Sequence, residues 1–267
     1  MVRRLILAYI VTGLQEAPAE SARQTGTART DSVAMVCHDL RTPLAAIKEA
    51  LALLAETASG QLDERQRRYL VVAREEIDRL NRMINDLVDA CRIDSGKVVL
   101  NSDAVHLPEL LATAIESLSL LISKREIKVE RNIAPALPPV TGDRDRLLRV
   151  FGNILDNAIK NSPPGGTIRA DIGLVDPESN VLAQKGIPAG AGYVEVRVSD
   201  DGPGIPAEAI DRIFGKFECV DPSGPGTGLG LAIVRSIVEV HRGKVWAEST
   251  LGQGARFHVI LPVNANS

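Results

Sequence analysis

The sequence predicts two domains: an α-helical hairpin, followed by an α/β domain in which helices back a mixed β-sheet. Two long amphipathic segments with a short polar connection predict the hairpin. Strand and helix patterns that alternate after residue 98 predict the α/β domain. With 267 residues, the chain is long enough to give each domain a core of its own.

The hairpin is expected over residues 31–97, after an N-terminal segment and small, polar linker over residues 1–30. Asp31 or Ser32 is the expected start of the first helix, since either side chain can cap it. Its apolar stripe is Val36, Leu40, Leu44, Ile47, Leu51 and Leu54. The second helix, near residues 63–93, carries Tyr69, Ile77, Leu80, Ile84, Leu87 and Cys91. One hairpin cannot bury both stripes, so we expect two copies to pair as a homodimeric four-helix bundle.

The second domain is expected over residues 98–267, with alternating elements. Strands are expected near residues 98–100, 126–131, 167–174, 193–199, 244–249 and 255–261, and helices near 107–123, 143–161 and 228–241. Residues 175–192 contain Asp-Pro, Gly-Ile-Pro and Gly-Ala-Gly, which predict an exposed hairpin loop.

Composition argues against several classes of protein. A net charge of −3 and an aromatic content of 3% do not suit a nucleic-acid binder. The longest early apolar run, Leu5 to Val11, is far shorter than the roughly 20 residues of a transmembrane helix, so we expect no membrane span. The three cysteines (Cys37, Cys91 and Cys219) lack metal-ligand spacing and are typical of reduced thiols in a cytoplasmic protein.

His38 is the first candidate for chemistry. At about 100° per residue it lies about 200° round the helix from Val36, which points it away from the apolar stripe. An imidazole with an ordinary pKa of about 6.5 is largely neutral at pH 7, so a ring nitrogen is free to act as a nucleophile. Thr42 shares this face, whereas Asp39 must reach sideways because neighbouring helical residues do not face each other. Pro43 cannot donate to the carbonyl of Asp39, which loosens the helix beside the histidine.

A polar face on the expected helix 143–161 is the second candidate. Asn153, Asn157 and Asn161 recur every four residues, and Lys160 lies near the same face. Amide oxygens and an ammonium group suit Mg²⁺ and phosphate oxygens. A solvated polar face without a ligand is the alternative.

Two glycine-rich segments follow. In the first, Asp200 and Asp201 end a strand, and Gly202 and Gly204 allow close approach of the backbone. The second, residues 226–230, runs into an apolar helix, whose first N–H groups favour an anion. It lacks the Gly-Lys-Ser/Thr ending of a P-loop.

In their order and spacing, these segments resemble the boxes of the two-component sensor histidine kinases, over roughly residues 31–262. Ile213 to Phe217 resembles the phenylalanine box of that family. The resemblance implies a HisKA-type phosphoacceptor hairpin and an α/β-sandwich ATP-binding domain of the GHKL (Bergerat) type. It also implies that ATP phosphorylates His38, that Asp39 serves as base, and that Thr42 positions water when the response regulator is dephosphorylated.

In the ATP pocket, the resemblance implies that Asn157 binds Mg²⁺, that Asn153 lines the same site and that Lys160 contacts phosphate. Spacing to the glycines favours Asp200 over Asp201 as the acceptor of the adenine amino group. The other implied pocket residues are Asn161, Gly202, Gly204, Gly226, Thr227, Gly228, Leu229 and Gly230. The phosphoryl group would then pass to an aspartate on a separate response-regulator receiver domain.

The sequence departs from the family pattern near the pocket. Asn161 replaces a usual aromatic residue, and Glu218 and Cys219 stand where the family often has an aromatic residue and an arginine. The lid, roughly residues 215–226, is short. Two alternatives therefore stay open: a weakly active regulator phosphatase or scaffold that uses Thr42, and a GHKL-type ATPase in which the histidine has no role.

Overall fold

The computed structural model describes residues 40, 42–58, 62–94, 100–175, 180–187, 192–220 and 228–263. The chain divides into two units, one ending at Lys97 and the other beginning at Val98. Four of the predicted site residues lie outside the described residues: His38, Asp39, Gly226 and Thr227. The polar linker and the expected start of the first helix lie outside them as well.

The first unit contains the predicted helical hairpin. Residues 42–57 are helical, and α3 (Glu64–Asp94) follows after a short connection. The helix α3 begins where a reciprocal cap forms: the Asp63 carboxylate accepts the Gln66 N–H at 2.7 Å, and the Gln66 side chain accepts the Asp63 N–H at 2.9 Å. Lys48 pairs with Asp78 at 2.7 Å from one helix to the other. The predicted hairpin is therefore confirmed over its described residues.

Much of the apolar surface of this hairpin is uncovered. Eight large apolar side chains are between 41% and 59% exposed: Leu40, Ile47, Leu53, Leu54, Tyr69, Val71, Val72 and Leu80. Soluble proteins rarely leave extended apolar surface without a partner. Among the described residues, no helix is both long enough and apolar enough to span a membrane. Pairing of two hairpins stays a prediction.

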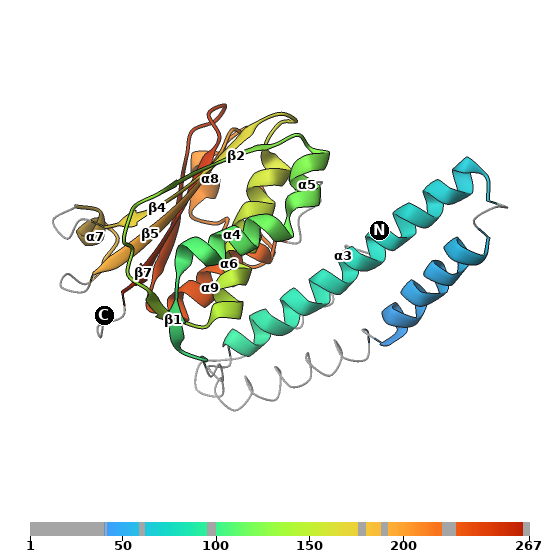
Figure 1. The fold of residues 1–267 in the computed structure, drawn as a ribbon, viewed down its shortest axis with the longest axis horizontal. Helices are drawn as coiled ribbons and strands as arrows, with labels where there is room; N and C mark the ends of the chain where they lie inside the picture. Colours follow the sequence, from blue (N-terminus) through green and yellow to red (C-terminus); the bar gives the residue numbers. More distant parts are fainter. Residues whose placement is uncertain are drawn as a thin grey trace. The chain divides into compact units, whose positions relative to one another are not determined.

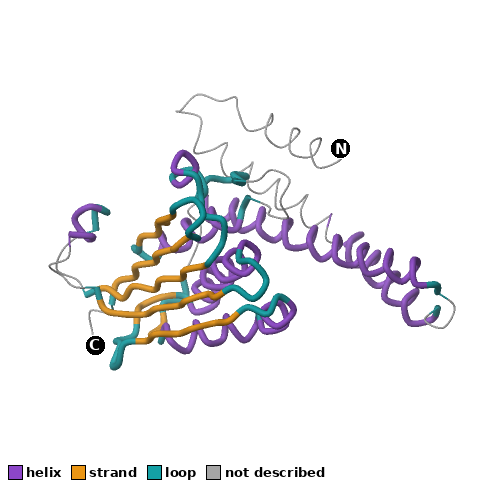
Figure 2. The backbone as a smooth tube through the Cα atoms, turned by 90° about the horizontal axis from the view of Figure 1, so that it is seen from above, coloured by secondary structure: helices purple, strands orange, loops and turns teal. Residues whose placement is uncertain are grey.

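The second unit contains a five-stranded sheet. Figures 1 and 2 show that it is a layered α/β structure. Its strands are β2 (Lys128–Ile133), β4 (Thr167–Leu174), β5 (Tyr193–Asp200), β6 (Lys244–Ser249) and β7 (Ala255–Pro262). They run in the order β2-β4-β5-β7-β6, and only the β2–β4 pair is parallel. A second, antiparallel pair is formed by β1 (Asp103–Val105) and β3 (Val140–Gly142). The sheet is mixed, as the sequence predicted.

Helices cover one face of the large sheet (Figure 1). The helices of this unit are α4 (Leu107–Ser117), α5 (Ser119–Lys124), α6 (Arg144–Asn161), α7 (Asn180–Gln184), α8 (Ala207–Ile210) and α9 (Gly230–Val240). The helix α6 is central, since it contacts α4, α9 and β5. Its apolar side chains are buried, including Phe151, Ile154 and Leu155. Their burial fixes the direction of the polar face that carries the asparagines.

A buried histidine ties α9 to the start of α6. His241 is 4% exposed; its Nε2 accepts the N–H of Asp143 at 2.9 Å, and its Nδ1 lies 2.7 Å from the Ile237 carbonyl oxygen. Because Nε2 accepts an N–H, it carries no proton, so the ring is neutral and Nδ1 donates to the Ile237 carbonyl. Burial also lowers the pKa of His241. Asp143 also caps α6, because its side chain accepts the Arg146 N–H at 3.1 Å. These bonds fix α6 and α9, which carry the candidate site, against each other.

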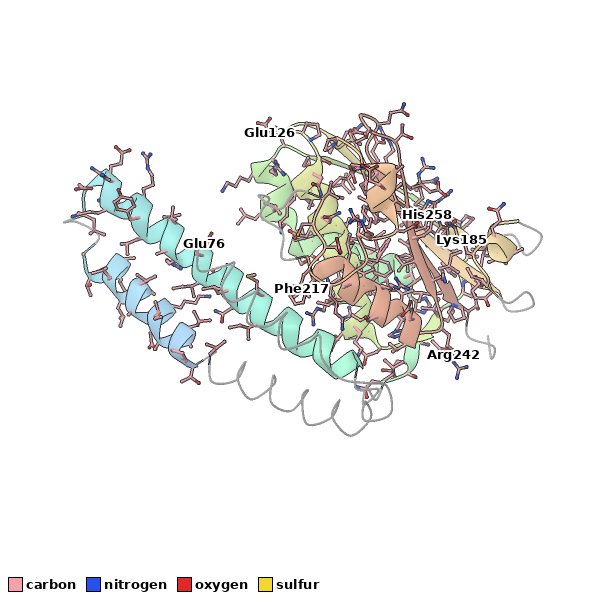
Figure 3. All side chains as sticks on the ribbon, turned by 180° about the vertical axis from the view of Figure 1, so that it is seen from behind. Glu76, Glu126, Lys185, Phe217, Arg242 and His258 are labelled. Carbon is pink, nitrogen blue, oxygen red and sulfur yellow. The ribbon has the colours of Figure 1, made fainter. Side chains whose placement is uncertain are left out.

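The prediction for residues 175–192 was wrong in one respect. The segment contains α7, and Leu182 is only 3% exposed because it packs on Tyr193, Trp246 and Ile260. These three residues alternate with core residues along their strands, so the segment covers the sheet face opposite the helices. Lys185, which Figure 3 labels, lies on this face. Its Nζ lies 5.1 Å from the centre of the Trp246 ring. The glycine and proline residues at both ends of the segment predict a loop, and the short apolar helix between them was therefore not predicted.

Other differences concern the ends of elements. Leu100 is not in a strand, and β1 begins at Asp103; a three-residue apolar run cannot specify its own pairing. The helix expected near residues 107–123 is two helices, which break at Leu118. Ser117 sits at the break and its hydroxyl bonds the Ala114 carbonyl at 2.7 Å, the kind of side-chain bond that competes with a helix. The three-residue β3 was not predicted.

Candidate functional site

The asparagines of α6 lie close to the start of α9. Asn153 Nδ2 donates to the Gly230 carbonyl at 3.2 Å, which joins the two helices. Asn161 Nδ2 donates to the main-chain oxygen of Asn157 at 2.8 Å and to its Oδ1 at 3.2 Å. The second glycine segment, far away in sequence, is thus brought to the predicted polar face.

Lys160, the predicted phosphate contact, forms an ion pair with Asp156 one turn earlier on α6. Both side chains are more than a third exposed. Ion pairs of this kind on a helix surface contribute only about 0.3–0.5 kcal/mol. A bound phosphate group can therefore displace Asp156 at little cost.

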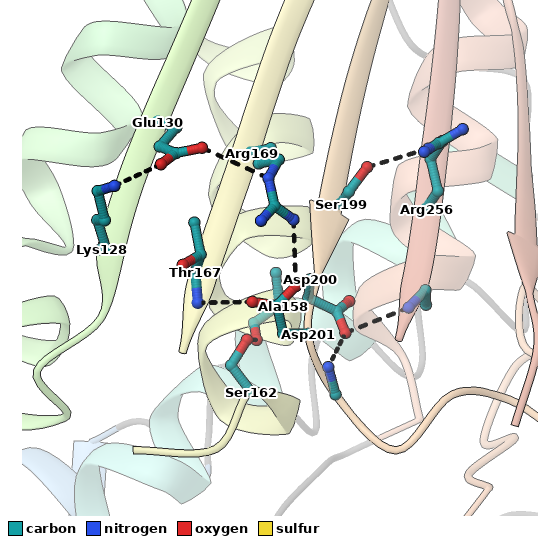
Figure 4. A network of polar contacts seen from close by, with 12 residues as sticks. Lys128, Glu130, Ala158, Ser162, Thr167, Arg169, Ser199, Asp200, Asp201 and Arg256 are labelled. Atoms are coloured by element: carbon teal, nitrogen blue, oxygen red, sulfur yellow. Dashed lines mark hydrogen bonds and ion pairs between the residues drawn. The ribbon is translucent and has the colours of Figure 1, made fainter. Parts of the chain in front are cut away.

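The two acids at the end of β5 have different partners (Figure 4). Asp200 is 5% exposed, and its Oδ1 accepts the N–H groups of Gly202 at 2.9 Å and Ala255 at 3.3 Å. Asp201 is exposed and accepts the Thr167 N–H and an N–H of Arg169, each at 3.1 Å. Asp201 therefore holds β4 to the end of β5. The second oxygen of Asp200 makes no hydrogen bond within the part of the chain that the structure describes.

Burial raises the pKa of the Asp200 carboxyl group above its ordinary value. The N–H groups of Gly202 and Ala255 act in the opposite direction, and the nearby charge of Asp201 adds to the rise. Burying a carboxylate is costly because its charged form loses contact with water. Acids in this condition occur preferentially at functional sites.

The first glycine segment packs against the end of α6. A Cβ atom at Gly202 would lie 2.7 Å from Asp200 Oδ1 and 2.9 Å from the Asn161 carbonyl oxygen. At Gly204 it would lie 2.3 Å from the Thr250 carbonyl oxygen. Only glycine fits at these two positions. The contact of Gly202 with the Asn161 carbonyl places Asp200 beside α6, the helix that carries the asparagines.

The second glycine segment closes onto the phenylalanine segment. The Phe217 N–H donates to the Gly228 carbonyl at 2.8 Å, and a Cβ atom at Gly228 would lie 2.6 Å from the Phe217 carbonyl carbon. Leu229 is 3% exposed, and Gly230 begins α9. These contacts fix the position of the first turn of α9 and of its N-terminal N–H groups.

The structure thus gathers nine predicted residues in the second unit: Asn153, Asn157, Lys160, Asn161, Asp200, Gly202, Gly228, Leu229 and Gly230. Gly204 lies in the loop that follows Asp200, the last residue of β5. Thr42 belongs to the first unit, where it is helical and exposed. Sequence reasoning missed Ala255, whose N–H supports Asp200, and Arg125, whose guanidinium donates to the Ile159 and Lys160 carbonyls at 2.7 Å. The sequence around these two residues does not indicate their roles, because both form their hydrogen bonds with residues more than 30 positions away in the chain.

Gly254→Ala is expected to destabilise the protein much more than Gly252→Ala. Both glycines have a left-handed backbone, with φ of +78° and +80°. That strain alone costs about 1–2 kcal/mol for alanine. At Gly254 the new Cβ atom would also lie 1.8 Å from the Asp200 carbonyl oxygen, whereas nothing lies within 4 Å at Gly252. Denaturant unfolding of both variants measures the difference, and equal losses would contradict the predicted clash.

Two family models match the chain. The model described as the His Kinase A (phospho-acceptor) domain matches residues 28–96. The model described as the histidine kinase-, DNA gyrase B- and HSP90-like ATPase matches residues 142–265. The two matches fall in the first and second units respectively.

Curated relatives carry both regions within longer chains. The adaptive-response sensory kinase SasA of Synechococcus sp. (strain JA-2-3B'a(2-13)) is 36% identical over 234 residues, which are 86% of this chain and 58% of that protein. The sensor histidine kinase WalK of Bacillus subtilis (strain 168) is 32% identical over 238 residues, which are 88% of this chain and 36% of that protein. The chain thus spans little more than half of the first relative and about a third of the second.

Solved structures agree with these matches. Full-length ShkA in complex with AMPPNP has a TM-score of 0.71 and 28% identity, over 88% of this chain and 46% of that one. The histidine kinase AdeS of Acinetobacter baumannii has a TM-score of 0.57 at 22% identity, over 85% of this chain and 98% of that one, a likeness of fold.

Proposed function

Because the chain belongs to the two-component sensor histidine kinases, we propose that it phosphorylates its own His38 with ATP and passes the phosphoryl group to an aspartate of a response regulator. One observation carries the proposal: Asp200 is buried, its Oδ1 is held by two main-chain N–H groups, and it lies beside the asparagines of α6, in a chain that also matches a phosphoacceptor domain. The division after Lys97 supports a phosphotransfer domain over residues 31–97 and an ATP-binding domain over residues 98–267.

Asp200 is the candidate acceptor for the adenine amino group. Its Oδ1 is held by two main-chain N–H groups, so the carboxylate is fixed. Its second oxygen has no hydrogen-bond partner among the described residues and can accept from a ligand. Asp201 is a poorer candidate because Thr167 and Arg169 use its two oxygens. Lys160 and the N-terminal N–H groups of α9 are the candidate contacts for the phosphate groups.

The residues present fit Mg²⁺ bound together with ATP. Among the described residues there is no group of three or more His, Cys, Asp or Glu that could hold a metal ion. Mg²⁺ on a nucleotide needs few protein ligands, because phosphates and water supply the rest of its octahedron. Asn157 would hold the ion through its side-chain oxygen, and bound Mg²⁺ would neutralise charge on the phosphates.

The phosphotransfer step belongs to the first unit. The unprotonated ring nitrogen of His38 would attack the γ-phosphorus while the bond to the bridging oxygen breaks, so that ADP leaves with that electron pair. Asp39 would take the proton released from the other ring nitrogen. Thr42, which is exposed, is the candidate that positions the water molecule that hydrolyses the phosphoaspartate of the response regulator. The exposed apolar side chains of the hairpin support a homodimer.

Labelling with γ-labelled ATP and Mg²⁺ tests the proposal directly. A phosphohistidine kinase gives protein-bound phosphate that is lost in acid and kept in base. Rapid release of phosphate without a labelled protein would instead identify a GHKL-type ATPase. Dephosphorylation of a phosphorylated regulator without self-labelling would identify the regulator phosphatase or scaffold.

ATP binding is expected to weaken on acidification. The loss of affinity is expected to begin at a higher pH than it would if Asp200 had the ordinary pKa of an aspartate. Since the folded-state pKa of Asp200 is raised, its carboxylate begins to take up a proton at higher pH than an ordinary aspartate, which puts a proton where the adenine amino group must donate. The same shift means that Asp200 favours the folded state most at low pH, and that this contribution is lost as pH rises through the raised pKa. Calorimetric titration with ATP between about pH 8 and pH 5 measures the effect. Asp200→Asn supplies the baseline, and parallel curves for the two proteins would contradict the prediction.

A further inference from the structure

The last turn of α6 contains a hydrogen-bond relay between two amide side chains. Asn161 Nδ2 donates both to the main-chain oxygen of Asn157, at 2.8 Å, and to the side-chain oxygen of Asn157, at 3.2 Å. Asn161 is exposed and Asn157 is half-buried, so the relay runs inward from the surface.

The main-chain bond fixes which way both amides point. A main-chain carbonyl can only accept, so the Asn161 side chain must present its NH₂ group to it. The same NH₂ group then faces the Asn157 amide. The Asn157 amide must present its oxygen as the acceptor, because two NH₂ groups cannot form a hydrogen bond with each other. The donor and acceptor roles in these two hydrogen bonds therefore determine the orientation of the Asn157 amide.

The backbone beneath the relay is held from outside the helix. The Arg125 guanidinium donates to the carbonyls of Ile159 and Lys160, each at 2.7 Å. Gly202 packs against the Asn161 carbonyl, where a Cβ atom would approach to 2.9 Å. Ser162 closes the helix with its N–H and its hydroxyl on the Ala158 carbonyl, at 3.0 and 2.9 Å. The backbone at Asn161 is thus held by hydrogen bonds from Arg125 and Ser162 and by packing against Gly202.

We infer that Asn161 is a positioning residue that acts through Asn157, by holding the side-chain oxygen of Asn157 ready for the Mg²⁺ of the bound nucleotide. The inference rests on the proposed function, in which Asn157 is the Mg²⁺ ligand. An amide oxygen has two lone pairs, so it can accept from Asn161 and still bind a cation. Outer hydrogen bonds of this kind orient metal ligands, and their loss typically weakens metal binding about 10- to 100-fold.

The inference gives Asn161 a different role from a direct nucleotide contact, and the two roles separate experimentally. A residue that orients the Mg²⁺ ligand changes the Mg²⁺ requirement and leaves Mg²⁺-free ATP binding alone. A residue that touches the nucleotide changes both.

The test is ATP binding by calorimetry with the whole chain, over a series of Mg²⁺ concentrations and in EDTA. Asn161→Leu removes the donor and is expected to raise the Mg²⁺ concentration needed for half-maximal enhancement about tenfold. Its ATP affinity in EDTA is expected to stay unchanged. Asn161→Gln keeps an NH₂ donor at the same helical spacing and is expected to restore most of the loss. Thermal melting of each variant checks that the fold is intact.

A double-mutant cycle completes the test. In an Asn157→Ala background, Asn161→Leu is expected to change the Mg²⁺ requirement no further, because the residue through which it acts is gone. A loss in EDTA equal to the loss in Mg²⁺ would overturn the inference in favour of a direct nucleotide contact. An unchanged Mg²⁺ requirement in Asn161→Leu, with a raised one in Asn157→Ala, would overturn the inference alone. An unchanged requirement in Asn157→Ala would overturn the proposed Mg²⁺ site as well.

Discussion

Replacing His38 by alanine is expected to abolish self-labelling by γ-labelled ATP and to leave ATP affinity unchanged. The proposed acceptor is one ring nitrogen, and alanine offers no substitute. The proposed ATP site lies in the second unit, which begins at Val98, so its residues keep their partners. Filter binding of labelled protein and calorimetry with ATP measure the two quantities on the same preparation.

His106→Ala is the matched control for this experiment. The chain has four histidines, and two of them, His241 and His258, are buried and bonded within the second unit. His106 is exposed, so it is the other histidine that can meet a phosphate donor. Label that persists in His38→Ala and disappears in His106→Ala would move the acceptor to His106. Label lost in His38→Ala together with ATP binding would show damage beyond the acceptor.

Local pattern was enough to predict the asparagine face. The apolar positions of α6 are buried, as their spacing predicted, and their burial decides where Asn153 and Asn157 point. The relay from Asn161 to Asn157 also lies within one helix, at the spacing of four residues at which side chains meet. The sequence marked Asn161 as a departure from the family pattern without indicating this bond, because the pattern concerns residue types and not their partners.

The environment of Asp200 depended on distant residues and was beyond local pattern. Ala255, which supports its carboxylate, lies 55 residues away, and the groups that occupy Asp201 come from β4, more than 30 residues earlier. The small helix α7 was missed for a related reason, since Leu182 is buried only because Trp246 and Ile260 come from two other strands. Tertiary contact decides such cases, and sequence signals for turns cannot reveal it.

Asp200→Asn is expected to weaken ATP binding about 100-fold or more, a loss of about 3 kcal/mol or more. The amide oxygen of asparagine can keep both main-chain N–H bonds, from Gly202 and Ala255, so the loop around it has no reason to move. The NH₂ group then takes the place of the second carboxylate oxygen. It would face the adenine amino group with a donor opposite a donor, which removes a charge-assisted bond and leaves two groups unsatisfied.

The same substitution is expected to leave the protein as stable as the native chain, or more stable. Burial raises the pKa of Asp200 because its charge is unfavourable there, and asparagine carries no charge to bury. Denaturant unfolding and calorimetry with ATP are the two measurements, and Asp201→Asn is the control at an exposed position. A large loss of affinity in Asp201→Asn with little in Asp200→Asn would transfer the adenine role to Asp201. Loss of both binding and stability in Asp200→Asn would mean that the carboxylate serves the fold, whereas loss of binding alone would mean that a buried charge is kept for the ligand at the expense of stability.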